Sequence, residues 1–430
     1  MVMKQVQRFL LIIALLFLVT SGIFAADING EVKTFGSYTF GTGNFEYGSS
    51  LQLTYNPSLS SEYYLMVDTT LKYQSDDNYS PIRINELYLQ GVATPSEDID
   101  FKLGYLHLTW GASDAFSPVD NLNPRPFSQS ISGDALDEKI PVLALNAEWY
   151  MNPTWSMEFV YQPEFRSNFT PDYVEQLFFG NQLAPLLGVN PQIMQIQIEK
   201  ESPDVDFAQP IWGIRARGKV GSIDTAFSFL KGYYLSAFPY QTDITLNTDG
   251  SSSVLAKMDY PERSVLGAEF QGEIPGIAGV TFRADFALFI PEQWSNQIAT
   301  HSPDGTTSFT TVDVFDEMYW KASVGADYTA EDNTYYNLIY LFGTPYEEGK
   351  DVSSYLFLRL EKPSPDNKWK PFLNSILSLE DGSMINIIGT DYKPKDNWTV
   401  TFSYSVSSGP ATSMLSMAGD TLFLNVKHVF

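Results

Sequence analysis

The chain has 430 residues and a formal charge of −25, with 26 Lys and Arg against 51 Asp and Glu. It contains no cysteine, which excludes disulfides, thiolate metal sites and cysteine nucleophiles. The excess of acid argues against a protein that follows nucleic-acid phosphates, because such a protein needs a basic face. Aromatic residues reach 15% while charged residues are only 18%. We therefore expect much of the surface to face something other than water.

The first 25 residues have the features of a signal peptide. Two basic residues precede an apolar run from Phe9 to Val19, and small or neutral residues follow up to Ala25. The run is too short to span a bilayer as a helix and suits the apolar region of an export signal. We predict export to the outer membrane, cleavage after Ala25 and a single mature domain of residues 26–430. An uncleaved N-terminal anchor is the alternative.

An alternation of apolar and polar residues recurs along the mature chain. Between Tyr63 and Tyr73 the odd-numbered residues are apolar apart from Thr69, whereas the even-numbered ones include Asp68 and Lys72. Ten residues at about 3.3 Å each, tilted by about 40°, rise roughly 25 Å, the height of the apolar band of an outer-membrane barrel. One face is expected to meet lipid and the other water or packed polar groups. The aromatic residues expected at the membrane girdles are Tyr63, Tyr73, Trp320, Tyr328, Trp398 and Phe430.

About eighteen such segments predict an all-β fold, a transmembrane up-and-down antiparallel β-barrel, with about sixteen strands as the alternative count. Short and long connections alternate, which predicts short periplasmic turns and long extracellular loops, including 111–140 and 163–208. A propeller or a long sandwich would not produce this alternation. The segments begin near Ile28, Phe45, Glu62, Ile82, Asp98, Pro141, Trp155, Gln209, Ser222, Arg263, Gly279, Glu317, Asn333, Val352, Trp369, Ser383, Asn397 and Thr421.

A pattern between Asn85 and Phe165 resembles an uncharacterised family of outer-membrane barrel proteins. Its elements are a strand with Glu-x-Tyr, a glycine-containing strand that ends in Trp-Gly-x-x-Asp, then Asp-x-x-Asn-Pro-Arg, and an Ile-Pro start to the next strand. Leu106 stands where the family usually has Gln. The resemblance implies a porin-like outer-membrane barrel, and members are often associated with export of lipidic or hydrophobic compounds. The matching positions are Glu86, Tyr88, Gly104, Trp110, Gly111, Asp114, Asp120, Asn123, Pro124, Arg125, Ile140 and Pro141.

Two long loops are candidates for a constriction or a lid. In the first, turn-favouring side chains at Asp120 and Asn123 and the rigid Pro124 predict an ordered loop. This loop either folds inward and narrows the lumen or packs outside against its neighbours. The second contains an apolar stretch, 171–201. That stretch would form short helices that cap or plug the barrel, contact a hydrophobic ligand or the outer leaflet, or make a self-packed external lid.

Cations at alternate strand positions are candidates for the pore lining. Arg215, Arg217 and Lys219 share one face at roughly 7 Å spacing, which would hold anionic groups of a solute. The alternative is a wall whose cations pair with Asp and Glu of adjacent strands. Both signs occur on the strands, so we expect a mixed-charge lumen beneath an acidic outer rim. The further candidates are Lys72, Arg283, Lys321, Arg359 and Lys427.

The composition favours transport over catalysis. The three histidines, His107, His301 and His428, leave little for a metal cluster or a relay, and no nucleophile motif accompanies them. No metal, cofactor or enzymatic activity is therefore expected. The leading function is a porin-like channel for passive passage of small solutes. The alternatives are a conduit or acceptor for hydrophobic or lipidic compounds that works with an export system, and a non-transporting surface barrel that displays its loops.

The expected partners follow from the barrel prediction. Phe430, with apolar residues at alternate positions behind it, resembles the C-terminal strand signal that barrel proteins present to the barrel-assembly machinery. Outer-membrane lipid and small solutes are the other expected partners. Homo-oligomer formation is left open, and no nucleic acid is expected.

Overall fold

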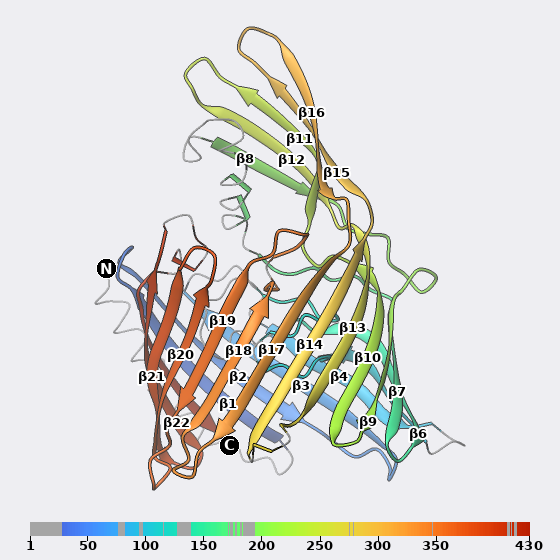
Figure 1. Cartoon of the computed structure of the whole chain (residues 1–430), viewed down its shortest axis with the longest axis vertical. Helices are drawn as coiled ribbons and strands as arrows, with labels where there is room; N and C mark the ends of the chain where they lie inside the picture. Colours follow the sequence, from blue (N-terminus) through green and yellow to red (C-terminus); the bar gives the residue numbers. More distant parts are fainter. Residues whose placement is uncertain are drawn as a thin grey trace.

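Eighteen antiparallel strands form one closed barrel in the computed structural model of the chain (Figure 1). The structure describes residues 28–430 apart from 76–81, 94–97, 115, 127–138, 171, 173–174, 177–178, 181–182, 184–193, 275, 278, 346, 411–412, 414 and 417–418. The predicted signal peptide lies outside the described residues. The barrel strands are β1 (Ile28–Thr39), β2 (Asn44–Tyr55), β3 (Tyr63–Gln74), β4 (Ile82–Val92), β5 (Ile99–Leu106), β6 (Val142–Asn152), β7 (Trp155–Gln162), β9 (Ile211–Val220), β10 (Ile223–Tyr233), β13 (Glu262–Glu273), β14 (Val280–Pro291), β17 (Tyr319–Thr329), β18 (Tyr335–Phe342), β19 (Ser354–Glu361), β20 (Trp369–Ser378), β21 (Met384–Lys395), β22 (Trp398–Ser408) and β23 (Thr421–Val429).

The predicted all-β barrel is confirmed, and each predicted strand start lies within about two residues of an observed one. Antiparallel pairing of β1 with β23 closes the sheet. Two backbone hydrogen bonds between Gly30 and Phe430, each 2.9 Å long, extend this pairing to the last residue. A Cβ at Gly30 would lie 2.4 Å from the Phe430 ring, so glycine leaves room for this ring against β1. Closure removes the unpaired edges that an open sheet would expose.

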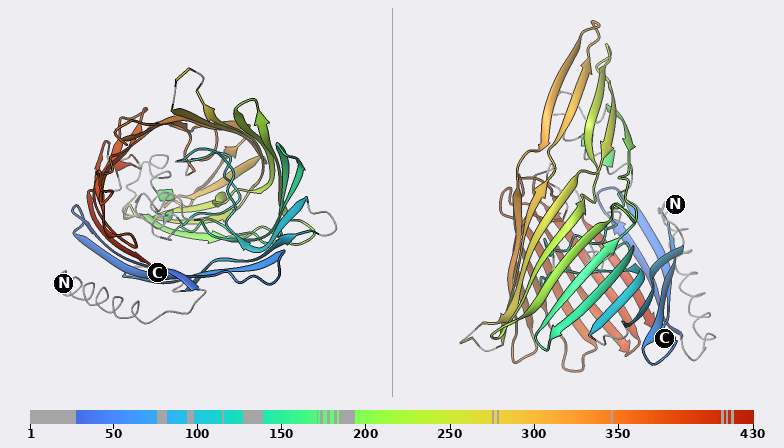
Figure 2. Two further views of the ribbon diagram at one scale, coloured as in Figure 1. Left: turned by 90° about the horizontal axis from the view of Figure 1, so that it is seen from below. Right: turned by 90° about the vertical axis from the view of Figure 1, so that its right-hand side faces the viewer.

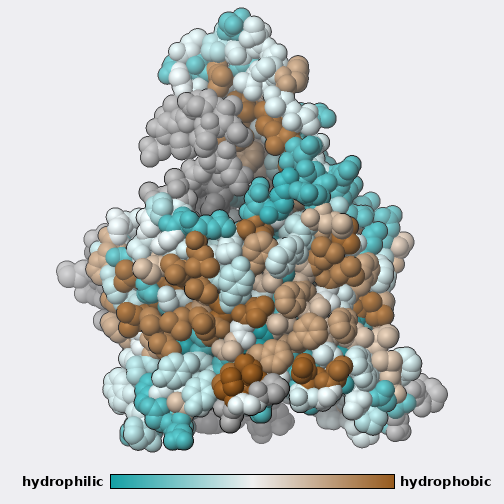
Figure 3. Space-filling view, viewed as in Figure 1, coloured by the Kyte–Doolittle hydropathy of each residue, from teal (hydrophilic) through white to brown (hydrophobic). Residues whose placement is uncertain are grey.

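The two faces of the barrel strands differ as the alternation predicts. Leu338, Trp320 and Phe402 point outward and are half exposed, whereas Asp285 and Lys321 point inward and are buried. Figure 3 shows apolar side chains gathered across the barrel wall, with hydrophilic residues above and below them. No helix in the described part of the chain has the length and apolar character needed to cross a membrane.

The residues predicted for the girdles occupy different surroundings. Tyr73, Trp320 and Tyr328 are exposed on the outer wall. The Tyr63 hydroxyl donates to the carbonyl of Val92 at 3.1 Å. The Trp398 ring stacks on His428 with 4.2 Å between the ring centres.

The two rims of the barrel carry different connections. The rim near the C-terminus carries short connections, and we call it the short-turn rim (Figure 1). The shortest of them include residues 153–154, and the longest include residues 56–62. At the opposite, long-loop rim, the connections include 107–141, 163–210, 234–261 and 292–318.

Three of these long connections contain strands that the sequence pattern did not predict. Together they form a five-stranded sheet in the order β16-β15-β11-β12-β8, which projects beyond the long-loop rim (Figures 1 and 2). We call it the outer sheet. Its strands are β8 (Met194–Lys200), β11 (Phe238–Leu246), β12 (Ser252–Asp259), β15 (Trp294–His301) and β16 (Thr307–Phe315).

The apolar stretch 171–201 contributes to the outer sheet. Phe179 and Leu183 are buried against Ile244, Val254 and Ala256 on one face of it. Among the described residues, this stretch therefore packs on a second, external core. The strands of the outer sheet were not predicted because they are short and rich in Thr, Ser and Gln. Such a composition also suits an irregular loop.

Candidate functional site

The chain that leaves β5 runs inside the barrel before it reaches β6 (Figure 2, left). We call residues 107–126 the inner segment. Its described contacts join it to the inner faces of strands from β4 to β21. A backbone in such a place needs hydrogen-bond partners for its N–H and C=O groups, and those partners define the site.

Trp110 fixes the inner segment against the first side of the barrel. Its side chain is 1% exposed, and its indole N–H donates to Glu158 on β7 at 3.1 Å. A Cβ at Gly213 on β9 would lie 2.7 Å from the indole, so the close approach requires glycine. Leu108 and Leu122 pack beside Trp110 in an apolar cluster that includes inward residues of β6, β7, β10 and β13. This side of the lumen is therefore filled by side chains.

Asp285 on β14 holds the middle of the inner segment. The side chain is fully buried and accepts hydrogen bonds from the backbone N–H groups of Ala112, at 3.0 Å, and Ser113, at 2.9 Å. The Ser113 hydroxyl lies 2.6 Å from that of Ser323 on β17. Gly111 has a φ of 107°, and a Cβ there would lie 1.9 Å from the Ser117 hydroxyl. The Trp-Gly pair thus allows the turn that points both N–H groups at Asp285.

Asp114 and Phe116 reach the next part of the wall. Asp114 forms an ion pair of 2.8 Å with Arg283 on β14 and accepts a hydrogen bond of 3.1 Å from Asn337 on β18. Arg283 also pairs with Asp327 on β17. Phe116 is buried among apolar side chains that point inward from β18 to β21.

Asn123 ties the end of the inner segment to the strands on either side of it. Its side-chain NH₂ donates to the carbonyls of Leu106, at 2.9 Å, and Ile140, at 2.8 Å, and its carbonyl oxygen accepts from the N–H of Leu108 at 2.7 Å. The side chain is 2% exposed. These three bonds connect the chain at the end of β5 with the chain before β6. Asn123 therefore links two segments that lie at the two ends of a long loop.

Asp120 gathers two cations of the same loop. Its Oδ2 atom lies 2.8 Å from Arg125 and 2.7 Å from Lys139, and Lys139 also donates to the carbonyl of Leu108 at 2.8 Å. The Asp and Arg of the Asp-x-x-Asn-Pro-Arg pattern therefore stabilise the loop itself. Glu86 on β4 accepts from the N–H of His107 at 3.2 Å, and Tyr88 packs inside the barrel with Trp110.

Two cavities of a few hundred cubic ångströms adjoin the inner segment. One of about 280 Å³ is lined by residues of the loop itself, among them His107, Asp114 and Lys139. The other, of about 430 Å³, lies toward the short-turn rim and is lined by Gly111 together with charged residues of the wall such as Arg217. The described residues contain no cluster of three His, Cys, Asp or Glu side chains suited to a metal ion.

The predicted pore-lining cations are engaged in ion pairs. Arg215 lies between Glu158, at 3.6 Å, and Glu269, at 2.5 Å. The wall therefore follows the alternative in which cations pair with neighbouring carboxylates, and Lys72 also has interactions of its own. The remaining pairs are Arg217 with Glu148, Lys219 with Asp224, Arg283 with Asp114 and Asp327, Lys321 with Glu348, Arg359 with Glu361 and Lys427 with Glu31.

Exposure of these cations changes along the barrel axis. The side chains of Arg217 and Arg359 are each 45% exposed toward the short-turn rim. At the level of the inner segment, Arg215 is 11% and Lys321 is 3% exposed. These cations are therefore more exposed near the short-turn rim than at the level of the inner segment.

One part of the inner wall is apolar. Inward positions of β18 to β21 carry Ile339, Phe357, Ile376 and Ile387, which pack with Phe116 of the inner segment and with Leu415 from the connection before β23. An aqueous barrel interior is usually polar, so a wall of this kind needs the inner segment as its cover.

Several residues that hold the inner segment were not among the predicted site residues. Glu158, Glu269, Asp285 and Arg263 occupy inward strand positions, and the alternation that placed Arg215 inside would also have placed them there. Glu348 lies in the connection between β18 and β19, where no periodicity marks a residue. Its role depends on a contact between distant parts of the chain.

Comparison with known proteins agrees with this architecture. A family described as protein of unknown function, DUF1302, matches residues 28–335, which include the whole inner segment. The chain belongs to this family. A search of the curated proteins found no match.

Solved outer-membrane barrels resemble the chain in fold. Wzi of Escherichia coli, described as a carbohydrate-binding β-barrel involved in group 1 capsule assembly, is 10% identical with a TM-score of 0.51, over 94% of this chain and 85% of Wzi. OccD3 (OpdP) of Pseudomonas aeruginosa is 9% identical with a TM-score of 0.49, over 94% and 91%. OmpT of Vibrio cholerae is 10% identical with a TM-score of 0.40, over 94% and 98%. At these identities the likeness to Wzi concerns the fold alone.

We predict that Asp285→Ala loosens the inner segment. The substitution leaves two buried N–H groups without an acceptor, at a cost of about 1–3 kcal/mol each. Hydrogen exchange at Ala112 and Ser113 should become faster, and the melting temperature of the folded barrel should fall. The matched control is Asp224→Ala, which removes a carboxylate from an exposed pair with Lys219. Equal exchange rates in the wild type and Asp285→Ala would contradict the anchoring role of Asp285.

His107 should make the loop sensitive to acid. Burial lowers its pKa below the ordinary value, and the charge of Lys139 lowers it further, whereas a hydrogen bond with the backbone of Lys139 acts in the opposite direction. The unfolded chain therefore binds the proton first as pH falls, so stability decreases through the range near pH 6.5. Between about pH 7.5 and pH 5, the wild type should lose more stability than His107→Asn. The exposed His301→Asn serves as the control, and parallel curves for the wild type and His107→Asn would show that His107 has no such effect.

Proposed function

We propose that the protein is an outer-membrane channel for passive passage of small solutes, and that the inner segment narrows this channel. A closed barrel of eighteen strands is wide enough for an aqueous lumen. The outward apolar side chains suit contact with lipid, and the short-turn rim would face the periplasm. The observation that carries the proposal is the change in exposure of the paired cations along the axis, from 45% at Arg217 to 3% at Lys321.

The anchors of the inner segment indicate the proposed route. They lie on strands from β4 to β21 and fill that side of the lumen. Solutes would pass along the remaining wall, formed by β22, β23, β1 and β2. Inward positions there include Ser403, Asn425 and Gln52, which are polar and uncharged. Because the charges nearby are already paired, the channel should admit small polar solutes with weak preference for charge.

The apolar wall supports a second candidate, a conduit for hydrophobic or lipidic compounds. If the inner segment moved away, Phe357 and its neighbours on β18 to β21 would offer an apolar path through the lumen. The outer sheet is the feature that would serve the third candidate, a surface barrel that only displays its loops. Conduction distinguishes the first candidate from the other two.

The mature protein, refolded and inserted in a planar bilayer, should give steady single-channel currents. Asp285→Ala should conduct more than the wild type, because its inner segment is no longer held across the lumen, whereas Asp224→Ala should conduct like the wild type. A folded, heat-modifiable barrel that stays silent in the bilayer would contradict the channel and favour the conduit or the display function.

A further inference from the structure

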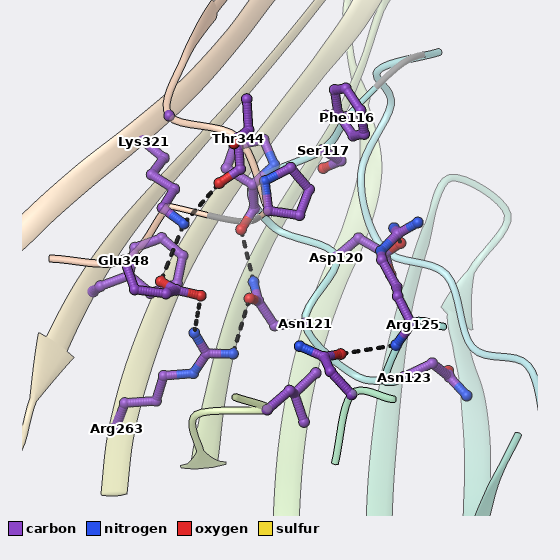
Figure 4. A pocket seen from close by; sticks show the side chains of 16 residues that line it. Phe116, Ser117, Asp120, Asn121, Asn123, Arg125, Arg263, Lys321, Thr344 and Glu348 are labelled. Atoms are coloured by element: carbon purple, nitrogen blue, oxygen red, sulfur yellow. Dashed lines mark hydrogen bonds and ion pairs between the residues drawn. The ribbon is translucent and has the colours of Figure 1, made fainter. Parts of the chain in front are cut away.

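A buried cluster of charges lies at the long-loop end of the lumen (Figure 4). Arg263 on β13 and Lys321 on β17 point toward the same place, and each side chain is 3% exposed. Glu348, from the connection between β18 and β19, lies between them. Its Oε1 atom is 3.5 Å from Nη1 of Arg263, and its Oε2 atom is 3.1 Å from Nζ of Lys321.

The described partners of the two cations supply one negative charge for two positive ones. Lys321 also donates to the carbonyl of Thr344 at 3.1 Å, and Arg263 donates through Nη2 to the side-chain oxygen of Asn121 at 3.1 Å. Both of these acceptors are neutral. A second charge buried without its partner is strongly unfavourable, so the cluster favours one further anion.

The neighbouring carboxylates are occupied by other groups. Glu347 accepts bonds from the N–H of Thr344, at 2.8 Å, and from the hydroxyl of Tyr355, at 2.9 Å. Asp120 pairs with Arg125 and Lys139. In the described part of the chain, neither carboxylate forms an ion pair or a hydrogen bond with Arg263 or Lys321, and Glu347 attracts Lys321 only through space.

Unused donors of Arg263 point to where a ligand would bind. Its Nε atom is buried and makes no hydrogen bond among the described residues, and Nη1 faces Glu348 only at the ion-pair distance of 3.5 Å. The rings of Tyr234 and Phe289 lie 4.6 Å and 5.3 Å from the guanidinium carbon. These rings cover the guanidinium group, so a further ligand must approach the N–H groups at its edge.

A small cavity adjoins both cations. Its volume is about 40 Å³, and its charged lining residues are the cations Arg125, Arg263 and Lys321 and the carboxylates Asp120 and Glu348. A cavity needs about 10–15 Å³ of such space to hold one water molecule, so this one has room for a small ion beside the two cations. Figure 4 shows side chains from the barrel wall, the inner segment and the β18–β19 connection around this space.

We propose that this cavity binds one small monovalent anion of chloride size between Arg263 and Lys321. The anion balances the second buried cation. It also strengthens the junction at which the inner segment, through Asn121, and the β18–β19 connection, through Glu348, meet the wall. The site is independent of which solute passes through the barrel.

Bromide, which scatters anomalously, tests the site directly in the wild-type protein. Crystals of the refolded mature protein grown in sodium bromide should show an anomalous peak in the cavity beside Arg263 and Lys321. An ordered water with no anomalous signal at this position would overturn the proposal.

Thermal unfolding gives the second test. At matched ionic strength the melting temperature should rise with chloride concentration and should not rise with gluconate, a much larger anion. Lys321→Met leaves Arg263 paired with Glu348 and should abolish the chloride effect without lowering stability in gluconate. The control Lys370→Met removes a cation that already has two carboxylates, Glu361 at 3.3 Å and Asp391 at 3.4 Å, and should keep the effect. A chloride effect that persists in Lys321→Met, or none in the wild type, would overturn the proposal.

Discussion

A polypeptide segment inside a barrel must find hydrogen-bond partners there, and the buried carboxylate of Asp285 supplies two of them. The cost of an unpaired buried N–H makes this interaction a condition for the path of the inner segment. Glycine at position 111 is needed for the turn at Asp285. On one side of this turn Trp110 reaches Glu158 on β7, and on the other side Asp114 reaches Arg283 on β14. The path of the inner segment thus determines which part of the inner wall is covered by side chains.

The charges of the inner wall have a structural role in this arrangement. Arg215 and Arg283 each contact two carboxylates, and several of these carboxylates also hold the inner segment or lie next to it. A row of cations with free charge would attract anions along its whole length, whereas a paired row fixes neighbouring strands and loops. The surplus charge at Arg263 and Lys321 is therefore notable, because it lies where three parts of the chain meet.

The barrel itself was predictable because lipid imposes a period of two on each strand. The start of β9 near Gln209 and of β14 near Gly279 follows from side chains that alternate between lipid and lumen. The same alternation placed Arg215 and Lys321 inside but left open whether each would be paired. The motif Asp-x-x-Asn-Pro-Arg predicted an ordered loop, while the three bonds of Asn123 that give this order depend on both ends of the loop.

The outer sheet and the partner Glu348 were not predictable in this way. Parallel pairing of β11 with β15 and of β12 with β8 joins segments from different connections, so no local turn signals it. The strands of the outer sheet project beyond the barrel rim, so contact with lipid does not impose a long apolar stripe on them. Glu348 meets Arg263 only after β13 and β18 have taken their places in the barrel.

A disulfide between the inner segment and the wall would test the central claim most directly. The hydroxyl oxygens of Ser113 and Ser323 are 2.6 Å apart, and the chain has no cysteine of its own. In the double variant Ser113→Cys, Ser323→Cys, mild oxidation of the folded barrel should form an intramolecular disulfide. The pair Ser113→Cys, Ser375→Cys, with position 375 on the outer wall beside Asn386, should not form one. If the 113–323 pair stays reduced while the barrel is folded, the inner segment does not lie against β17 in the lumen.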